Sequence, residues 1–507
     1  MDWKKLQNGS DIRGVALPDI KNETVNLNEN TVEQLGKSFG IWLKKYYPEK
    51  KKLKVSVGMD ARISGPALRK AVMNGLLSTG FDVLDCGMAS TPAMFMSTII
   101  GENQTDAGIM LTASHLPFNR NGMKFFTKQG GLDKKDIAEI LEIAEIVGAQ
   151  NLAPLQNTVP AAGTLTTINF MNTYSEHFVN MVREKVNHSE DYEKPLKGLK
   201  IVVDAGNGAG GFYAEKILKP LGADISDSQF LEPDGLFPNH VPNPEDETAM
   251  ASVVEKVKAS KADFGIIFDT DVDRAAFVAN DGFPINRNAL IALISAIVLE
   301  EHPETTIVTD SITSNGLNRF INEQLKGKHH RFKRGYKNVI NEAIRLNESG
   351  EACMLAIETS GHAALRENYF LDDGAYLATK IIITLAKMRQ KGQSLISLIK
   401  DLQIPAESRE LRIKIQDIDF KSCGEKIIAD LETFVQNKEG WEIVPNNFEG
   451  IRVNCNAAQQ QGWFLLRLSL HDPILPLNVE SEVEGGVNRM INELLSFFGQ
   501  YKDQIMI

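Results

Sequence analysis

The sequence predicts an α/β protein: three similar α/β domains with mixed sheets around a central cleft, followed by a C-terminal α+β domain. Three observations lead to this prediction: the chain length, a strand–loop–helix unit that occurs three times, and a change of pattern near the C-terminal end. At 507 residues the chain exceeds what one hydrophobic core usually supports, so several domains are expected.

The repeated unit consists of an apolar strand that ends in Asp, a polar or glycine-rich loop, and a stretch with helical periodicity. Its three copies end their strands at Asp60, Asp204 and Asp310. Each copy is followed by a second apolar strand, a loop of reactive residue types, another strand and a turn. Loops beyond strand ends are where open α/β sheets bind ligands, so we expect these three loops to line one shared cleft.

Linker composition indicates where the domains meet. The Pro-rich stretch 151–164 and the segment 300–306 separate the repeated units. After residues 402–410 the pattern changes to alternating strands closed by a helix from about Glu482 to Phe498, which indicates a separate domain. The expected domains span residues 1–155, 156–300, 301–404 and 405–507.

Composition and charge exclude several classes of protein. With 43% hydrophobic and 24% charged residues the chain is typical of globular proteins, and it has neither an apolar leader nor an apolar stretch long enough to span a membrane. A cytoplasmic protein without a membrane partner is therefore expected. The net charge of −11 argues against a nucleic-acid partner. Four widely spaced cysteines predict reduced thiols, and they favour neither a zinc cluster nor a disulfide framework.

The first reactive loop places Ser114 beside His115, with Lys124 a short distance further along the chain. A serine hydroxyl is a weak nucleophile unless a base or a cation assists it, and His115 and Lys124 are the candidates for that assistance. The G-x-S-x-G turn of many hydrolases is absent here. By itself this loop leaves open whether Ser114 is a catalytic residue or only a turn residue.

The second loop carries Asp269, Asp271 and Asp273, followed by Arg274, directly after the apolar strand FGIIF. Carboxylate oxygens suit a hard cation, and Mg²⁺ commonly combines a few carboxylates with phosphate oxygens. The loop does not match a calcium-binding EF-hand, because Arg274 and Asn280 occupy the positions where an EF-hand needs Gly and Glu. The alternative is a solvated acidic turn, but three acids at the end of a buried strand would repel one another without a cation.

Two further motifs carry groups suited to sugars and phosphates. The third loop offers the carboxylate of Glu358, the hydroxyl of Ser360 and the imidazole of His362, which bind sugar hydroxyls or relay protons. In the last domain Arg467 and Ser469 close an apolar strand, an arrangement suited to bidentate capture of a phosphate. An ion pair at the strand end remains the alternative for Arg467.

The segment 206–211 satisfies the pattern G-x-G-x-x-G after an apolar strand. A dinucleotide site there would leave the loop of three aspartates without a role. We therefore interpret these glycines as a tight turn that leads into a helix.

Taken in order, the motifs resemble the α-D-phosphohexomutase superfamily, which includes phosphomannomutase/phosphoglucomutase, phosphoglucomutase and phosphoglucosamine mutase. The resemblance runs almost from end to end. The segments that carry it are Gly9–Gly14, Val57–Gly65, Thr112–Pro117, Asp269–Arg274 and Glu358–His362. It implies an intramolecular phosphotransferase that interconverts hexose 1-phosphate and hexose 6-phosphate, of mannose and/or glucose, with action on glucosamine phosphate as the alternative.

The resemblance also implies roles for individual residues. Ser114 would carry the phosphoryl group, with Mg²⁺ as cofactor and hexose 1,6-bisphosphate as intermediate and activator. The implied catalytic residues are Ser114, His115, Lys124, Arg274 and His362, the implied metal ligands are Asp269, Asp271 and Asp273, and the implied substrate-binding residues are Arg13, Gly335, Lys337, Glu358, Ser360, Arg467 and Ser469. The four domains would then carry, in order, the phosphoserine, metal, sugar and phosphate loops, in a monomer or homodimer that binds a small sugar phosphate.

Two departures from the family pattern bear on specificity. In the phosphate loop Leu470, His471 and Asp472 replace Gly, Thr and Glu, and Ile357 replaces the glycine before the sugar-loop glutamate. Two competing functions also stay open. One is a phosphatase that forms an aspartyl phosphate on Asp269, and the other is a sugar-phosphate-binding protein without turnover.

Overall fold

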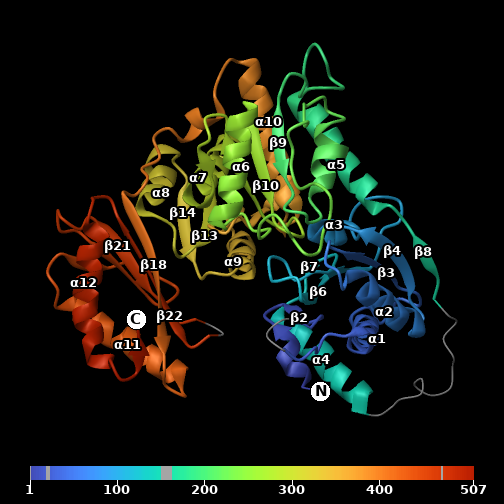
Figure 1. Ribbon diagram of the computed structural model, residues 1–507, viewed down its shortest axis with the longest axis horizontal. Coiled ribbons are helices and arrows are strands. Elements are labelled where there is room, and N and C mark those ends of the chain that lie inside the picture. Colours follow the sequence, from blue (N-terminus) through green and yellow to red (C-terminus); the bar gives the residue numbers. More distant parts are fainter. Residues whose placement is uncertain (1, 19–22, 150–162, 470–471) are drawn as a thin grey trace. The chain divides into compact units, whose positions relative to one another are not determined.

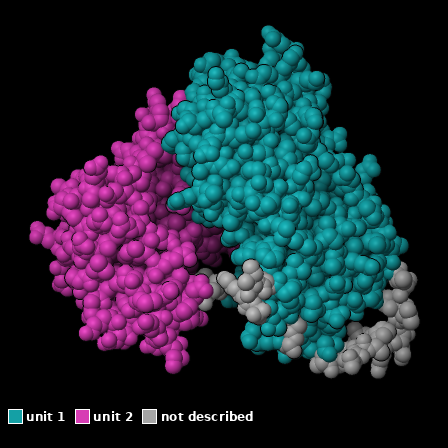
Figure 2. Space-filling model, viewed as in Figure 1, with its two compact units in different colours: residues 1–286, 360–395 teal, residues 287–359, 396–507 magenta. Residues whose placement is uncertain are grey.

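The computed structural model describes residues 2–18, 23–149, 163–469 and 472–507 (Figure 1). These residues form two compact units, shown in different colours in Figure 2. The first unit comprises residues 1–286 and 360–395, and the second comprises residues 287–359 and 396–507. The predicted linker lies almost entirely outside the described residues.

The first unit begins with a mixed sheet in the strand order β1-β2-β6-β5-β3-β4-β8, and β7 pairs with β6. Its strands are β1 (Gln7–Asn8), β2 (Asp11–Val15), β3 (Lys54–Met59), β4 (Asp82–Met88), β5 (Ala107–Leu111), β6 (Arg120–Thr127), β7 (Gly130–Gly131) and β8 (Leu165–Thr167). Strands β5, β3, β4 and the edge strand β8 run parallel, whereas β6 is antiparallel to both β5 and β2. As a result, β3 and β5 present their carboxyl ends at the same edge of the sheet.

Helices cover both faces of this sheet. The helices are α1 (Glu29–Tyr46), α2 (Gly65–Ser78), α3 (Thr91–Met96) and α4 (Lys134–Ala149). Because side chains alternate along a strand, Val55 and Val57 point into the core that the long helices share. Gly108 lies on the other face, where an added Cβ would come within 2.2 Å of the Met94 carbonyl oxygen of α3. Because Gly108 has no side chain, α3 packs closely against this face of the sheet.

A second mixed sheet has the order β12-β11-β10-β9, in which β10 is parallel to β9 and antiparallel to β11. Its strands are β9 (Ile201–Asp204), β10 (Phe264–Phe268), β11 (Ala275–Ala279) and β12 (Pro284–Ile285). Other elements of this part of the unit are α5 (Phe170–Val186), the π-helix η2 (Tyr213–Leu218), α6 (Glu247–Ser260), the hairpin strands β16 (Ala363–Leu365) and β17 (Leu371–Asp372), and α10 (Gly374–Gln390). Helix α6 packs its apolar face on β9, β10 and β11 through a small buried cluster that includes Val253 and Ile267.

The second unit contains the parallel strands β14-β13-β15 of a five-stranded mixed sheet. Its elements are α7 (Arg287–Glu301), β13 (Thr306–Asp310), α8 (Asn315–Arg319), the π-helix η3 (Phe320–Gln324), β14 (Lys328–Phe332), α9 (Tyr336–Glu348) and β15 (Cys353–Ile357). Thus each of the three predicted copies forms a strand that ends at or just before its Asp and leads toward a helix. This confirms the prediction that a unit of strand, loop and helix occurs three times.

The C-terminal part is an antiparallel sheet in the order β19-β20-β21-β22-β18-β23, with two long helices packed against it. Its elements are β18 (Glu407–Ile415), α11 (Phe420–Gln436), β19 (Trp441–Ile443), β20 (Ile451–Cys455), β21 (Gly462–Leu466), β22 (Ile474–Ser481), α12 (Gly486–Phe498) and β23 (Ile505–Met506). The last helix begins at Gly486 rather than near Glu482, because β22 continues to Ser481 and a turn ends at Gly485 with φ +72°.

The predicted fold class is confirmed: three α/β domains with mixed sheets are followed by a sheet-rich C-terminal domain. The four domain boundaries and the shared cleft stay predictions. Among the described residues, no helix combines the length and the apolar composition that crossing a bilayer would require.

Candidate active site

Ser114 lies in the loop that follows β5, at the edge of the first sheet where β3 also ends. The residue is almost fully buried, with 4% of its surface exposed, and its φ of 51° is in the left-handed region that non-glycine residues seldom adopt. Its hydroxyl donates to Asp269 Oδ2 at 3.2 Å and accepts from Arg274 Nη2 at 3.2 Å. The serine oxygen is therefore fixed between an acid and a guanidinium from the second sheet.

Arg62 organises the loop that carries Ser114. Its guanidinium, fully buried after β3, donates to the backbone carbonyls of Ser114, Leu116 and Pro117. Its Nε lies 3.2 Å from Asp60 Oδ2, and this carboxylate is also fully buried. Burial raises the pKa of Asp60 to about 6, although the charge of Arg62 opposes the shift. The sequence indicates no role for Arg62, because a single Arg after a strand carries no signal of its tertiary partners.

Asp269, Asp271 and Asp273 follow β10, and each is at most 1% exposed. One oxygen from each carboxylate lies within 4.8 Å of the others. Burial and the neighbouring aspartates raise the pKa of Asp269 and of Asp271. Burial would do the same for Asp273, but Lys124, His362 and Arg274 together lower its pKa. The loop is therefore not the solvated acidic turn that was the alternative.

The oxygen donors of this loop fit a hard divalent cation such as Mg²⁺. Asp271 Oδ1 and Asp273 Oδ1 are buried, and neither accepts a hydrogen bond from any described residue. Buried carboxylate oxygens without donors are costly unless a cation or a proton meets them. The other oxygen of Asp271 accepts from the Thr91 hydroxyl of α3. The chemistry of this donor set thus supports a cation at the three aspartates.

Two buried cations flank the acidic loop, residues 269–273. Lys124, on β6, donates from Nζ to Asp273 Oδ2 at 3.0 Å. Arg274 lies 3.3 Å from Asp269 and donates to His115 Nδ1 at 2.6 Å. Burial and the charge of Arg274 lower the pKa of His115 to about 3, so its imidazole is neutral near pH 7 and its Nδ1 accepts. His115 is therefore a neutral hydrogen-bond acceptor for Arg274 rather than a cation.

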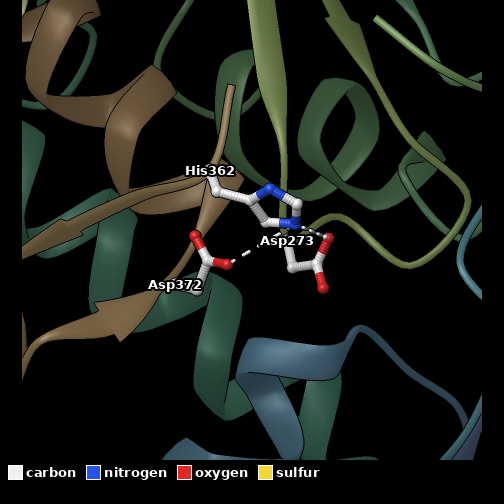
Figure 3. A group of neighbouring side chains, drawn as sticks. All are labelled: Asp273, His362 and Asp372. Atoms are coloured by element: carbon white, nitrogen blue, oxygen red, sulfur yellow. Dashed lines mark ion pairs between the residues drawn. The ribbon is translucent and has the colours of Figure 1, made fainter. Parts of the chain in front are cut away.

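His362 meets the acidic loop from the β16–β17 side, as Figure 3 shows. Its Nε2 lies 3.7 Å from Asp273 Oδ1 and 3.6 Å from Asp372 Oδ2, while Ser360 Oγ lies 2.8 Å from its Nδ1. An isolated antiparallel bridge between Arg274 and His362 aligns the two loops. Asp372 was missed in the sequence, because it comes from a short strand without a recognisable motif.

Arg13 supports the Ser114 loop from β2. Its Nη1 donates to the Ala113 carbonyl oxygen at 3.1 Å, and its Nη2 lies 3.0 Å from Asp11 Oδ2.

The glycine-rich segment 206–211 supports the loop of the three aspartates. Ala209 N donates to the Thr270 carbonyl oxygen at 2.8 Å, and a Cβ on Gly208 would come within 2.7 Å of that oxygen. The glycines therefore serve close backbone packing, as their interpretation as a turn predicted.

The remaining predicted residues belong to the second unit: Gly335, Lys337, Glu358, Arg467 and Ser469. Gly335 caps α9 and donates from its backbone N to Glu358 Oε1 at 2.6 Å. Asp472 N donates to Ser469 Oγ at 3.2 Å, whereas Leu470 and His471 of the same loop lie outside the described residues. The contact between Gly335 and Glu358 thus brings the Gly335 turn to the start of the third loop.

Glu449 is a further acidic residue of the second unit that the sequence did not reveal. Its Oε1 lies 3.4 Å from Arg467 Nε and accepts from Ser311 Oγ at 2.9 Å. Its Oε2 accepts from the backbone N of Arg334 at 2.8 Å. The carboxylate thus links Arg467 to Arg334, which lies just before α9. The ion pair considered as an alternative for Arg467 is present.

Family models match most of the described chain. In order they are the phosphoglucomutase/phosphomannomutase alpha/beta/alpha domains I, II and III, which match residues 4–150, 173–282 and 286–404. The chain belongs to the phosphoglucomutase/phosphomannomutase family. The resemblance to the α-D-phosphohexomutase superfamily is thereby confirmed, and the chain is a phosphohexomutase, an isomerase that transfers a phosphoryl group.

Relatives of this phosphohexomutase include the phosphomannomutase/phosphoglucomutase of Pseudomonas syringae pv. tomato, which is 30% identical over 439 residues, 86% of this chain and 85% of the relative. The phosphoglucomutase/phosphomannomutase of Thermococcus kodakarensis is 30% identical over 475 residues, 93% of this chain and 94% of the relative. Among solved structures, a phosphoglucomutase/phosphomannomutase family protein from Burkholderia thailandensis has a TM-score of 0.77 and 26% identity, and the match covers 98% of both chains.

Proposed function

We propose that this phosphohexomutase interconverts the 1- and 6-phosphates of mannose and/or glucose through a phosphoryl group carried on Ser114. The observation that carries the proposal is the position of Ser114 Oγ, 3.2 Å from both Asp269 Oδ2 and Arg274 Nη2, within a buried cluster of three aspartates. A serine placed there is poorly suited to hydrolysis, because the adjoining imidazole of His115 already accepts from Arg274 at Nδ1 and has a pKa of only about 3. It is well suited to hold a phosphate dianion between cations.

In the proposed cycle the phosphorylated Ser114 meets a hexose monophosphate. The bond between phosphorus and Ser114 Oγ breaks, a bond forms between phosphorus and the free sugar hydroxyl, and the proton of that hydroxyl passes to a protein base. The resulting hexose 1,6-bisphosphate reorients in the active site without being released. Its other phosphoryl group then returns to Ser114, and the proton is given back to the sugar oxygen. No phosphate is gained or lost over the cycle.

Residues of the first unit supply the groups that this chemistry needs. Phosphoryl transfer depends mainly on positioning and charge neutralisation. Lys124 and Arg274 are buried cations beside the aspartates, and His115, whose Nδ1 lies 3.3 Å from Ser114 Oγ, is the first candidate for proton transfer. His362 is the second candidate for proton transfer. Mg²⁺, when held by Asp269, Asp271 and Asp273, would neutralise the charge on the transferring phosphoryl group.

We assign substrate recognition to the substrate-binding residues named from the sequence. Glu358 and Ser360 would bind the sugar hydroxyls, while Arg467 and Lys337 would bind the phosphate that is not being transferred. The names of the Pseudomonas and Thermococcus relatives support mannose and glucose phosphates as substrates. Glucosamine phosphate remains the alternative substrate.

A coupled assay with mannose, glucose and glucosamine 1-phosphates, in the presence of Mg²⁺ and a hexose 1,6-bisphosphate, tests the proposal. We expect turnover of the mannose or glucose phosphate and loss of turnover in Ser114→Ala, with an unchanged circular dichroism spectrum. Preferred turnover of glucosamine phosphate would support the alternative substrate. Release of inorganic phosphate at the same rate in wild type and Ser114→Ala would support the phosphatase, and no reaction with any sugar would support a binding protein.

A further inference from the structure

The first unit contains a pocket of about 680 Å³ that uses none of the residues assigned above to catalysis or substrate binding. It lies among four segments: the first turns of α2, the carboxyl end of β4, the connection from β8 to α5, and the glycine-rich loop with the segment 231–233. Its volume is within the usual range for sites that bind small organic molecules. Nothing in the proposed cycle accounts for a pocket here.

Arg69 is the distinctive polar group of the pocket. Its side chain is 21% exposed, and its Nε lies 3.4 Å from Asp85 Oδ1, which already accepts from Gly87 N at 3.0 Å. Arg69 Nε is buried without a hydrogen-bond acceptor, and across the described residues no protein acceptor receives a hydrogen bond from this guanidinium. A guanidinium carries five N–H donors in a fixed plane and binds carboxylates through two of them. Arg69 therefore retains hydrogen-bond donors for a ligand beside its ion pair with Asp85.

Apolar side chains form most of the remaining lining. They include Met88 of β4, Met171 of α5, Phe212 beside the glycine-rich loop, and Leu231. Methionine and aromatic side chains make favourable contacts with flat rings. The pocket thus combines one cationic group with an apolar wall suited to an aromatic body.

The charges around the pocket limit the charge of the ligand. Asp85 pairs with Arg69, and Glu215 lies 2.7 Å from Lys219 on the next turn. Lys216 and Glu232 complete the charged lining, which therefore holds three acids and two cations. A single negative charge can be met by Arg69 here, whereas a phosphate dianion would face three carboxylates with little compensation.

The walls of the pocket are held in place before any ligand arrives. Ala209, which lines the pocket, donates its backbone N–H to the Thr270 carbonyl oxygen at 2.8 Å. Ala89, another lining residue, precedes Thr91, whose backbone N donates to the Asp271 carbonyl oxygen at 2.8 Å. A preformed pocket requires little ordering when a ligand binds, which favours affinity.

We propose that this pocket binds a small aromatic monoanion, a carboxylate or sulfonate on an aromatic ring system, with the acid group on Arg69 and the rings against the apolar wall. The site is separate from the sugar-phosphate site, so hexose phosphates do not compete for it. Its occupant is distinguished from the substrate by having one negative charge and an apolar body.

Fluorescence titration of the full-length protein with 8-anilinonaphthalene-1-sulfonate tests the proposal, since this probe combines a sulfonate with aromatic rings. We expect saturable binding that saturating glucose 1-phosphate does not displace. Arg69→Met should weaken binding by about 10- to 100-fold, the range expected for hydrogen bonds to a charged group. The matched control is Arg183→Met on α5, whose arginine side chain is 24% exposed and pairs with Glu193 at 2.8 Å. It should bind the probe like wild type.

A second variant keeps the test decisive if Arg69→Met folds poorly. Thr167 lines the mouth of the pocket and is exposed, so Thr167→Trp should narrow the pocket without disturbing the core, and should also weaken probe binding. Equal affinity in wild type, Arg69→Met and Thr167→Trp would overturn the proposal. Displacement of the probe by glucose 1-phosphate would also overturn it, because the probe would then occupy the substrate site. Both readouts are independent of turnover, so they do not depend on the proposed function.

Discussion

Thr91 offers a sharp test of how the acidic loop is positioned for a cation. The residue is 4% exposed at the start of α3, and its hydroxyl donates to Asp271 Oδ2. Its backbone N donates to the Asp271 carbonyl oxygen at 2.8 Å, and that bond survives any side-chain change. Thr91→Val keeps the volume and removes only the hydroxyl. Both side-chain oxygens of Asp271 would then accept no hydrogen bond from the described residues.

The expected loss follows from this single contact. A hydrogen bond to a charged group contributes about 1.5–3 kcal/mol, which corresponds to about 10- to 100-fold in affinity. Groups that orient metal ligands typically change metal affinity by a similar factor. We therefore expect Thr91→Val to raise the Mg²⁺ concentration for half-maximal turnover about 10- to 100-fold. Turnover measured against free Mg²⁺, with calorimetric titration of Mg²⁺ alone, gives this value.

Thr98→Val is the matched control. Thr98 follows α3, is fully buried, and donates its hydroxyl to the Phe95 carbonyl oxygen at 2.8 Å without contacting an aspartate. It should leave the Mg²⁺ dependence unchanged even if it costs some stability. Equal Mg²⁺ dependence in wild type and both variants would refute the reasoning, because Asp271 would then not need Thr91 to bind the cation.

Three further predictions concern other contacts. Arg62→Gln leaves Asp60 buried without its ion-pair partner at 3.2 Å, so we expect a loss of about 3–5 kcal/mol in unfolding free energy, measured by urea unfolding. Lys124→Met removes the cation 3.0 Å from Asp273 and should lower kcat on the order of 100-fold, measured in the coupled assay. Burial raises the pKa of Glu480 from 4.5 to about 7, so its contribution to stability is present below pH 4.5 and lost as pH rises through about 7. Glu480→Gln should therefore remove about 3 kcal/mol of pH dependence, developed mainly between about pH 4.5 and pH 7, in urea unfolding.

The sequence predicted those parts of the site that are encoded locally. Asp269, Asp271 and Asp273 follow an apolar strand, so their burial and proximity could be expected from the strand itself. Ser114 was ambiguous alone and became interpretable only from the order of motifs along the chain. The structure adds that its hydroxyl contacts Asp269.

The sequence did not reveal residues whose roles depend on contacts between distant segments. Thr91 reaches Asp271 across 180 residues that no periodicity relates, and Glu449 meets Arg467 because β20 pairs with β21. Arg62 binds backbone carbonyls, which every residue possesses, so no partner residue type could indicate its role. The start of the last helix was misplaced by four residues, because the continuation of β22 to Ser481 is set by pairing with β18.

The most direct test of the central claim is the location of the transferred phosphate. The protein is incubated with a hexose 1,6-bisphosphate and Mg²⁺, quenched in acid, digested and analysed by mass spectrometry. We expect one acid-stable phosphate on Ser114, which a hexose monophosphate then removes with formation of the bisphosphate. An acid-labile phosphate on Asp269, or an unphosphorylated Ser114 in a protein that still turns over, would contradict the account.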